Sequence, residues 1–160
     1  MSIESEINNL ARVFPPHPID PVTAFSEWGG TYTDATKFRE SVRGRKWTEL
    51  EPAVLERSHD ALVFFGPASI ADYLPAFLVS LLRQDRELSA MPSFLYGVLT
   101  RGKDPQRFDE RFALLTESQR RAVANALAAL EVEMAGSSRQ QDLTEVLDSY
   151  WRSLIAGEGV

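Results

Sequence analysis

The residue types of an acid–base site gather around His59. Ser58, His59 and Asp60 are consecutive, and Glu56 precedes them in the same segment. An imidazole oriented by a carboxylate is a common general base, so His59 with Glu56 or Asp60 forms the candidate catalytic group. Residues adjacent in sequence seldom converge on one atom, however, and no Gly-x-Ser-x-Gly segment is present. We therefore favour a helix end where these residues cap the backbone or face solvent.

A run of cations beside an aromatic residue is the second candidate site. It comprises Arg39, Arg43, Arg45, Lys46 and Trp47. Arginines interleaved with aromatic rings can hold a carboxylate or a phosphate, or stack on bases, so these residues are the candidates for binding a ligand or a partner. The alternative, which we favour, is structural. Long cationic stems often cover a core aromatic residue while their charged heads stay in water.

The spacing within this run predicts a rigid arrangement. Gly44 suits the positive φ that ends a helix, and Trp47 is placed to pack back on the next helix as a hydrophobic staple. Arg45 and the lysine after it would then be held between two helix ends. We expect these cations either to clamp an internal carboxylate, such as Glu51 or Asp60, or to form an anion-binding face.

Other chemistries lack the residues they need. The sequence has no cysteine, which excludes disulfides, thiolate zinc sites, iron–sulfur clusters and cysteine nucleophiles. Its two histidines, His17 and His59, stand in no zinc-binding spacing. The glycines match neither Gly-x-x-x-x-Gly-Lys nor Gly-x-Gly-x-x-Gly, the loops that bind phosphates. We therefore expect no metal and no cofactor.

Charge and composition narrow the class of partner. The chain has 160 residues, with 17 Lys+Arg against 23 Asp+Glu and a formal net charge of −6. This balance disfavours a general nucleic-acid binder, which needs clustered positive charge to neutralise phosphates. No apolar segment is long enough to cross a bilayer, and the acidic start is unlike a secretory signal. We expect a cytoplasmic protein without membrane contact.

Apolar residues recur at helical spacing, so the sequence predicts an all-α fold. Residues 67–82 are apolar almost all round, which indicates a buried central helix with a kink or a break at Pro75. Two long amphipathic helices, joined by the short link Gly136-Ser-Ser138, should form an antiparallel hairpin at the C-terminus. Aromatic residues can line a pocket, but at helical spacing they more often pack in the core; they are Phe64, Phe65, Tyr73, Phe77, Phe94 and Tyr96.

Local signals predict where the other helices begin. Ser2 can cap a first helix, although Ser5 stands where a capping box needs Glu or Gln. The segments 48–51 and 116–119 both have the capping-box pattern, and Asp104 followed by proline marks another start. Together these signals predict several short helices around the central one.

The sequence predicts a single all-α domain over residues 1–160, with about six to eight helices of ordinary length. Residues 1–33 form its N-terminal segment, whose structure is the hardest to predict. Prolines between Pro15 and Pro18 favour an extended path that reaches to about Pro21, and Gly29-Gly30 marks a break.

Four segments between residues 43 and 130 resemble one family of small bacterial proteins of unknown function. The segments are Arg43–Trp47, His59–Phe65, Tyr73–Leu78 and Arg111–Gln119. The corresponding patterns in the family are Arg-Gly-Lys-x-Trp, Ala-Leu-x-Phe, Tyr-x-Leu-Pro-Ala and Arg-Phe-x-x-Leu-Thr-x-x-Gln. This chain departs from the first pattern, with Arg45 in place of lysine. The family brings no catalytic residues, so the resemblance supports the fold and implies no mechanism.

We expect the chain to be a non-enzymatic bacterial protein that binds another protein, as an immunity or regulatory factor. The acidic charge, the small size and the absence of catalytic motifs fit this class. One alternative is a small hydrolase or transferase that uses His59 with a neighbouring carboxylate. Another is a nucleic-acid accessory protein that uses the segment Arg39–Trp47. The sequence leaves the oligomeric state open.

Overall fold

The chain was analysed as a computed structural model, which describes residues 2–19 and 33–156. These residues form helices and connecting segments without a strand, which confirms the all-α prediction. The elements in chain order are α1 (Ile3–Val13), α3 (Thr33–Val42), the 3₁₀ helix η1 (Trp47–Glu49), α4 (Pro52–Arg57), the 3₁₀ helix η2 (His59–Phe64), α5 (Pro67–Arg83), α6 (Met91–Leu99), α7 (Pro105–Arg111), α8 (Glu117–Glu133), α9 (Gln140–Val146), the π-helical turn η3 (Leu147–Trp151) and α10 (Arg152–Ala156).

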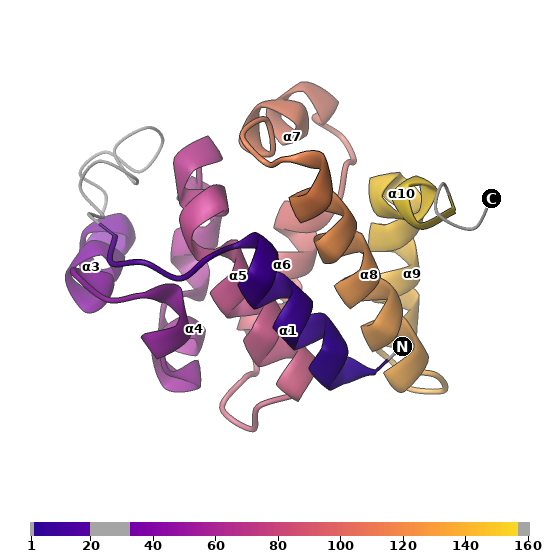
Figure 1. Cartoon of the computed structure of the whole chain (residues 1–160), viewed down its shortest axis with the longest axis horizontal. Helices are drawn as coiled ribbons and strands as arrows, with labels where there is room; N and C mark the ends of the chain where they lie inside the picture. The colour runs from indigo at the N-terminus through magenta and orange to yellow at the C-terminus, as the bar shows by residue number, and fades with distance from the viewer. Residues whose placement is uncertain (1, 20–32, 157–160) are drawn as a thin grey trace.

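Helix α5 lies in the middle of the molecule, with α1, α4 and α8 around it (Figure 1). Its side chains are buried on nearly every side from Tyr73 to Leu82. Pro67 occupies the first turn, where its missing N–H has no helical partner to lose. Gln84 ends the helix in the left-handed region, at φ 52°. The buried central helix is confirmed, and it runs through Pro75 as one element instead of two.

Helix α1 packs against α5 and α8 (Figure 1). It begins with a reciprocal capping box, in which Ser5 N donates to Ser2 Oγ at 3.1 Å and Ser2 N donates to Ser5 Oγ at 3.2 Å. The expectation that Ser5 prevents this box is wrong. A serine hydroxyl at the third position accepts the N–H as a Glu or Gln oxygen would.

The segment after Lys46 begins its helices differently from the prediction. The sequence pattern places a capping box at residues 48–51, but the Glu49 carboxylate reaches back to Lys46 N at 2.8 Å and caps η1 instead. Helix α4 then starts at Pro52 without a capping bond from the side chain of Glu51. The pattern is wrong here because the Glu49 carboxylate, two positions before Glu51, caps a turn that starts earlier in the chain.

Helices α7 and α8 begin where the sequence predicts. The Asp104 carboxylate accepts the Arg107 N–H at 3.1 Å. Thr116 and Gln119 exchange hydrogen bonds between side chain and backbone at 3.0 and 3.1 Å. Gly44, after α3, has the positive φ expected of it, at 70°. These features depend on neighbouring residues, which is why the sequence alone predicts them.

The last three elements pack against α8. The chain turns at Gly136, which has φ 83°, and comes back along α8 (Figure 1). Glu131 contacts Thr144 at 2.8 Å, and Arg120 contacts Tyr150 at 2.8 Å, the order of contacts expected of antiparallel helices. The π-helical turn η3 was not predicted.

Some predictions concern residues that lie outside the described part of the chain. They are the path of the proline-rich segment to Pro21 and the break at Gly29-Gly30. The described residues share one hydrophobic core cluster, which includes Leu10, Phe38 and Leu147. The division of residues 1–160 into domains stays a prediction.

We predict that Trp151→Phe lowers the free energy of unfolding by about 1–3 kcal/mol, because it removes a buried hydrogen bond. The Trp151 Nε1–H donates to the Leu99 carbonyl at 2.8 Å, and phenylalanine leaves that carbonyl without its donor. Urea unfolding measures the change. Val132→Ala, on a side chain that is 74% exposed on α8, is the control and should change stability by less than about 0.5 kcal/mol. Equal losses in the two variants would contradict the prediction.

Candidate functional site

The Glu56 carboxylate caps the start of α6 from another helix. Its Oε1 accepts hydrogen bonds from Ser89 N at 2.7 Å and Met91 N at 3.0 Å, and its Oε2 accepts one from Ala90 N at 3.1 Å. The first N–H groups of a helix have no acceptor within the helix, and its N-terminus carries partial positive charge. A carboxylate satisfies both needs, so Glu56 fastens α4 to α6.

These contacts change the acidity of Glu56. Burial raises the pKa of its carboxyl, but the N–H donors of Met91, Ser89 and Ala90, together with nearby His59, outweigh that effect and leave the pKa below its ordinary value. In the catalytic alternative His59 is the base and Glu56 orients its imidazole. The Glu56 carboxylate, however, lies 3.9 Å from His59 Nδ1, beyond hydrogen-bond distance, and accepts hydrogen bonds from the start of α6 instead. Its geometry therefore gives no support to this part of the catalytic alternative.

His59 contacts both carboxylate residues of the candidate catalytic group. Its Nδ1 lies 2.7 Å from the Glu56 carbonyl oxygen, and its Nε2 lies 3.2 Å from Asp60 Oδ1. Its ring centroid is 4.6 Å from that of Phe94 in α6. The structure therefore brings His59, Glu56 and Asp60 together, but it uses them to join the start of η2 to α4 and α6.

The basic segment is also tied into the fold. The Arg45 guanidinium donates to the carbonyls of Ser41 and Glu49 and forms an ion pair with Glu51 at 3.8 Å. Trp47 is buried, and its Nε1–H donates to the Phe14 carbonyl at 2.9 Å. A buried indole is unavailable for stacking on a base. Both observations favour the structural alternative for this segment.

The remaining cations of the segment have different surroundings. Arg43 and Lys46 are exposed, and Arg39 is half-buried. The Trp47 ring forms part of the wall of a hollow of about 230 Å³ between α1, η1, α4 and α5. Neither Arg43 nor Lys46 lines this hollow, so the structure does not join these cations and the Trp47 ring into one stacking face.

A larger hollow lies between η2, α6 and α7. It has a volume of about 500 Å³, and an adjoining hollow of about 540 Å³ extends it along α7. We call the two together the α6–α7 groove. The residues that line it are Val63, Ser93, Phe94, Gly97, Val98, Thr100, Gly102, Lys103, Asp104, Arg107, Phe108 and Arg111.

The floor of the groove is apolar and open at Gly97. Val63 is 43% exposed beside it, which is unusual for a large aliphatic side chain in this protein. A Cβ atom added to Gly97 would meet no described atom within 4 Å. Glycine inside a helix destabilises it by about 1 kcal/mol relative to alanine. Packing among the described residues does not require this glycine, so its effect is to keep the backbone of α6 accessible.

Arg111 forms a cationic wall of the groove. It is only 8% exposed, and it donates from Nε to the Phe65 carbonyl at 2.9 Å and from a terminal nitrogen to the Val63 carbonyl at 3.1 Å. Burial, and then the neighbouring charge of Arg107, lower the pKa of the Arg111 guanidinium to about 10. At neutral pH this residue still carries its charge. The groove therefore combines an apolar floor with fixed positive charge.

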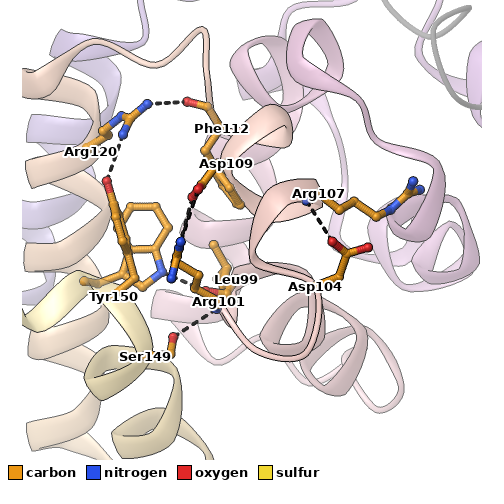
Figure 2. A network of polar contacts seen from close by, with 10 residues as sticks. Leu99, Arg101, Asp104, Arg107, Asp109, Phe112, Arg120, Ser149 and Tyr150 are labelled. Atoms are coloured by element: carbon orange, nitrogen blue, oxygen red, sulfur yellow. Dashed lines mark hydrogen bonds and ion pairs between the residues drawn. The ribbon is translucent and has the colours of Figure 1, made fainter.

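A network of polar contacts holds α7 in place (Figure 2). Arg101 pairs with Asp109 through two hydrogen bonds of 3.0 and 3.2 Å, and its backbone N–H donates to Ser149 Oγ at 3.0 Å. Arg120 donates to the Phe112 carbonyl at 2.8 Å, just after α7. The Arg107 side chain points away from this network, on the other side of α7 (Figure 2).

The described residues contain no cluster of three or more His, Cys, Asp or Glu side chains that is suited to a metal ion. Within the same part of the chain, every helix is too short or too polar to span a bilayer.

The fold and the site define a class of small all-helical proteins with a surface groove. Within this class the chain belongs to the DUF6714 family, a family of unknown function, whose sequence model matches residues 19–155. This confirms the resemblance to a family of unknown function that the central segments indicate. Neither the curated proteins nor the solved structures contain a significant match to the chain.

Analysis of the sequence missed the α6–α7 groove. Two signals could have indicated it. Gly97 interrupts an otherwise apolar helical segment, which is a sign of close approach to the backbone. Arg107 and Arg111 are separated by one helical turn, so two like charges share one face of α7.

We predict that Glu56→Gln destabilises the chain by about 1–3 kcal/mol at pH 7, because it removes charge-assisted hydrogen bonds to the start of α6. The pKa of Glu56 is lower in the folded chain than its ordinary value of 4.5. Its stabilising effect is therefore present above about pH 4.5 and is lost as the pH falls through the folded pKa. Urea unfolding at several pH values should show the difference from wild type shrinking below this point.

Glu87→Gln is the matched control, because Glu87 is exposed in the same connection before α6. A loss of stability for Glu56→Gln that stays unchanged as the pH falls well below the ordinary pKa of 4.5, or an equal loss for Glu87→Gln, would show that the cap does not work in this way.

The basic segment gives a second prediction. Arg45→Ala should lower the melting temperature by about 2–4 °C, the shift that corresponds to about 1 kcal/mol in a chain of this size. The physical reason is the loss of its contacts with Ser41, Glu49 and Glu51. Arg43→Ala, on an exposed cation, should leave the melting temperature unchanged. Equal behaviour of the two variants in differential scanning fluorimetry would show that Arg45 is ordinary solvated surface.

Proposed function

We propose that this chain is a cytoplasmic, non-enzymatic bacterial protein that acts by binding another protein, in an immunity or regulatory role, and that the α6–α7 groove is its binding surface. The observation that carries the proposal is the open apolar floor at Gly97, between Val63 and Val98. Protein interfaces are built around apolar clefts of this kind, with charged residues at the rim.

Three further observations support a binding role. The candidate catalytic carboxylate Glu56 is engaged by three backbone N–H groups at the start of α6. The groove is open to the surface and extends along α6 and α7, which suits a segment of a partner protein better than a small substrate that must be enclosed. The polar contacts of α7 keep the walls of the groove in place, so little conformational entropy is lost when a partner binds.

The test uses Gly97→Leu, which places a side chain in the groove. Apart from the two neighbouring residues and the local backbone of α6, no described atom lies within 4 Å of the added Cβ, so the new side chain starts in open space. Replacing glycine in a helix should not destabilise the fold, so the melting temperature should stay at or above that of wild type. Gln141→Leu adds the same side chain to the exposed surface of α9 and is the matched control.

Wild type and both variants are used as baits in lysate of the source cells. We expect a protein that wild type and Gln141→Leu retain and Gly97→Leu does not. The same protein, made recombinantly, should bind wild type in isothermal titration calorimetry and bind Gly97→Leu at least about tenfold more weakly. Equal affinity of the purified partner for Gly97→Leu and wild type, or no partner that binds wild type directly, would overturn the proposal.

A further inference from the structure

We infer that the segment which occupies the α6–α7 groove is an acidic stretch of a partner protein, with an apolar side chain seated at Gly97 and a carboxylate at Arg107 and Arg111. This inference rests on the function proposed above and specifies the chemistry of the partner.

The charges around the groove have one predominant sign. Lys103, Arg107 and Arg111 line it, and Asp104 is the one acidic residue among its described lining residues. The Asp104 carboxylate accepts the backbone N–H of Arg107 and so is already engaged in starting α7. The groove is therefore positive within a chain whose formal net charge is −6. Complementary charge guides the choice of partner and speeds its encounter.

The two arginines are suited to a carboxylate. They lie one helical turn apart on α7, and Arg111 is fixed by the Phe65 and Val63 carbonyls. A carboxylate placed between two guanidinium groups relieves their mutual repulsion and accepts paired hydrogen bonds. Because Arg111 is held in position before binding, fewer of its conformations are lost when the complex forms.

The apolar floor favours a peptide over a nucleic acid. Val63 and Phe94 offer a surface for an aliphatic or aromatic side chain, and Gly97 lets the backbone of the partner come close to α6. A phosphate chain would gain contacts with the cations alone and would leave the apolar floor unused. An acidic peptide with an apolar residue uses both parts of the groove.

The experiment selects a phage-displayed library of random peptides against wild type, with Gly97→Leu as the counter-selection. Peptides that depend on the groove should be enriched in Asp and Glu beside Leu, Ile or Phe. Their affinity, measured by fluorescence anisotropy, should fall at least about tenfold for Arg107→Glu, the loss expected when charge-assisted hydrogen bonds are replaced by repulsion. It should also fall as salt rises from about 0.05 to 0.5 M.

Arg86→Glu is the matched control, because it makes the same charge change on an exposed residue that does not line the groove. Equal binding by Arg107→Glu and Arg86→Glu, or enrichment without acidic residues, would overturn the inference and leave the proposed function standing. If no peptide distinguishes wild type from Gly97→Leu, the groove itself is not a binding surface and both fail. Binding of a single-stranded oligonucleotide that Arg107→Glu abolishes would assign the cations to nucleic acid and would also overturn it.

Discussion

The structure depends on satisfying the backbone groups at the ends of many short helices. Each helix leaves N–H groups at its start and carbonyls at its end without partners, and short helices have a large share of such residues. Several of these ends are buried or partly buried. Side chains from distant elements supply the partners. The Glu56 carboxylate accepts N–H groups at the start of α6. The Trp151 indole donates to the carbonyl of Leu99, the last residue of α6, and the Trp47 indole donates to the carbonyl of Phe14, just after α1.

This constraint explains why the residues whose side chains could take part in catalysis or binding are poor catalytic candidates. Carboxylates, guanidinium groups and indole N–H groups form strong hydrogen bonds, and here many of these bonds go to backbone groups. Glu56, Arg45 and Trp47 were singled out from the sequence because of their residue types. In the structure, the polar atoms of each residue form hydrogen bonds with a helix end or a loop carbonyl.

The sequence predicts those features that depend on neighbouring residues. The capping box at Thr116, the positive φ of Gly44 and the buried helix from Pro67 are of this kind, because the relevant atoms are within a few residues of one another. Contacts between distant segments leave no local pattern. Glu56 reaches the start of α6, and Arg111 reaches the carbonyls of η2, across more than thirty residues of chain. These contacts bring the walls of the groove together, and the local signals at Gly97 and on α7 do not show that the two elements meet.

The same contacts account for the glycine at the floor of the groove. Helix α6 is short and contains Gly97, which makes it a weak helix by itself, although Pro92 is well placed in its first turn. Glu56 holds its first turn, and the Trp151 indole holds the carbonyl of Leu99 at its other end. A helix fixed at both ends can contain a glycine in its exposed middle without unwinding. The hydrogen bonds at the ends of α6 thus allow the fold to present an open stretch of helix backbone beside the cations of α7.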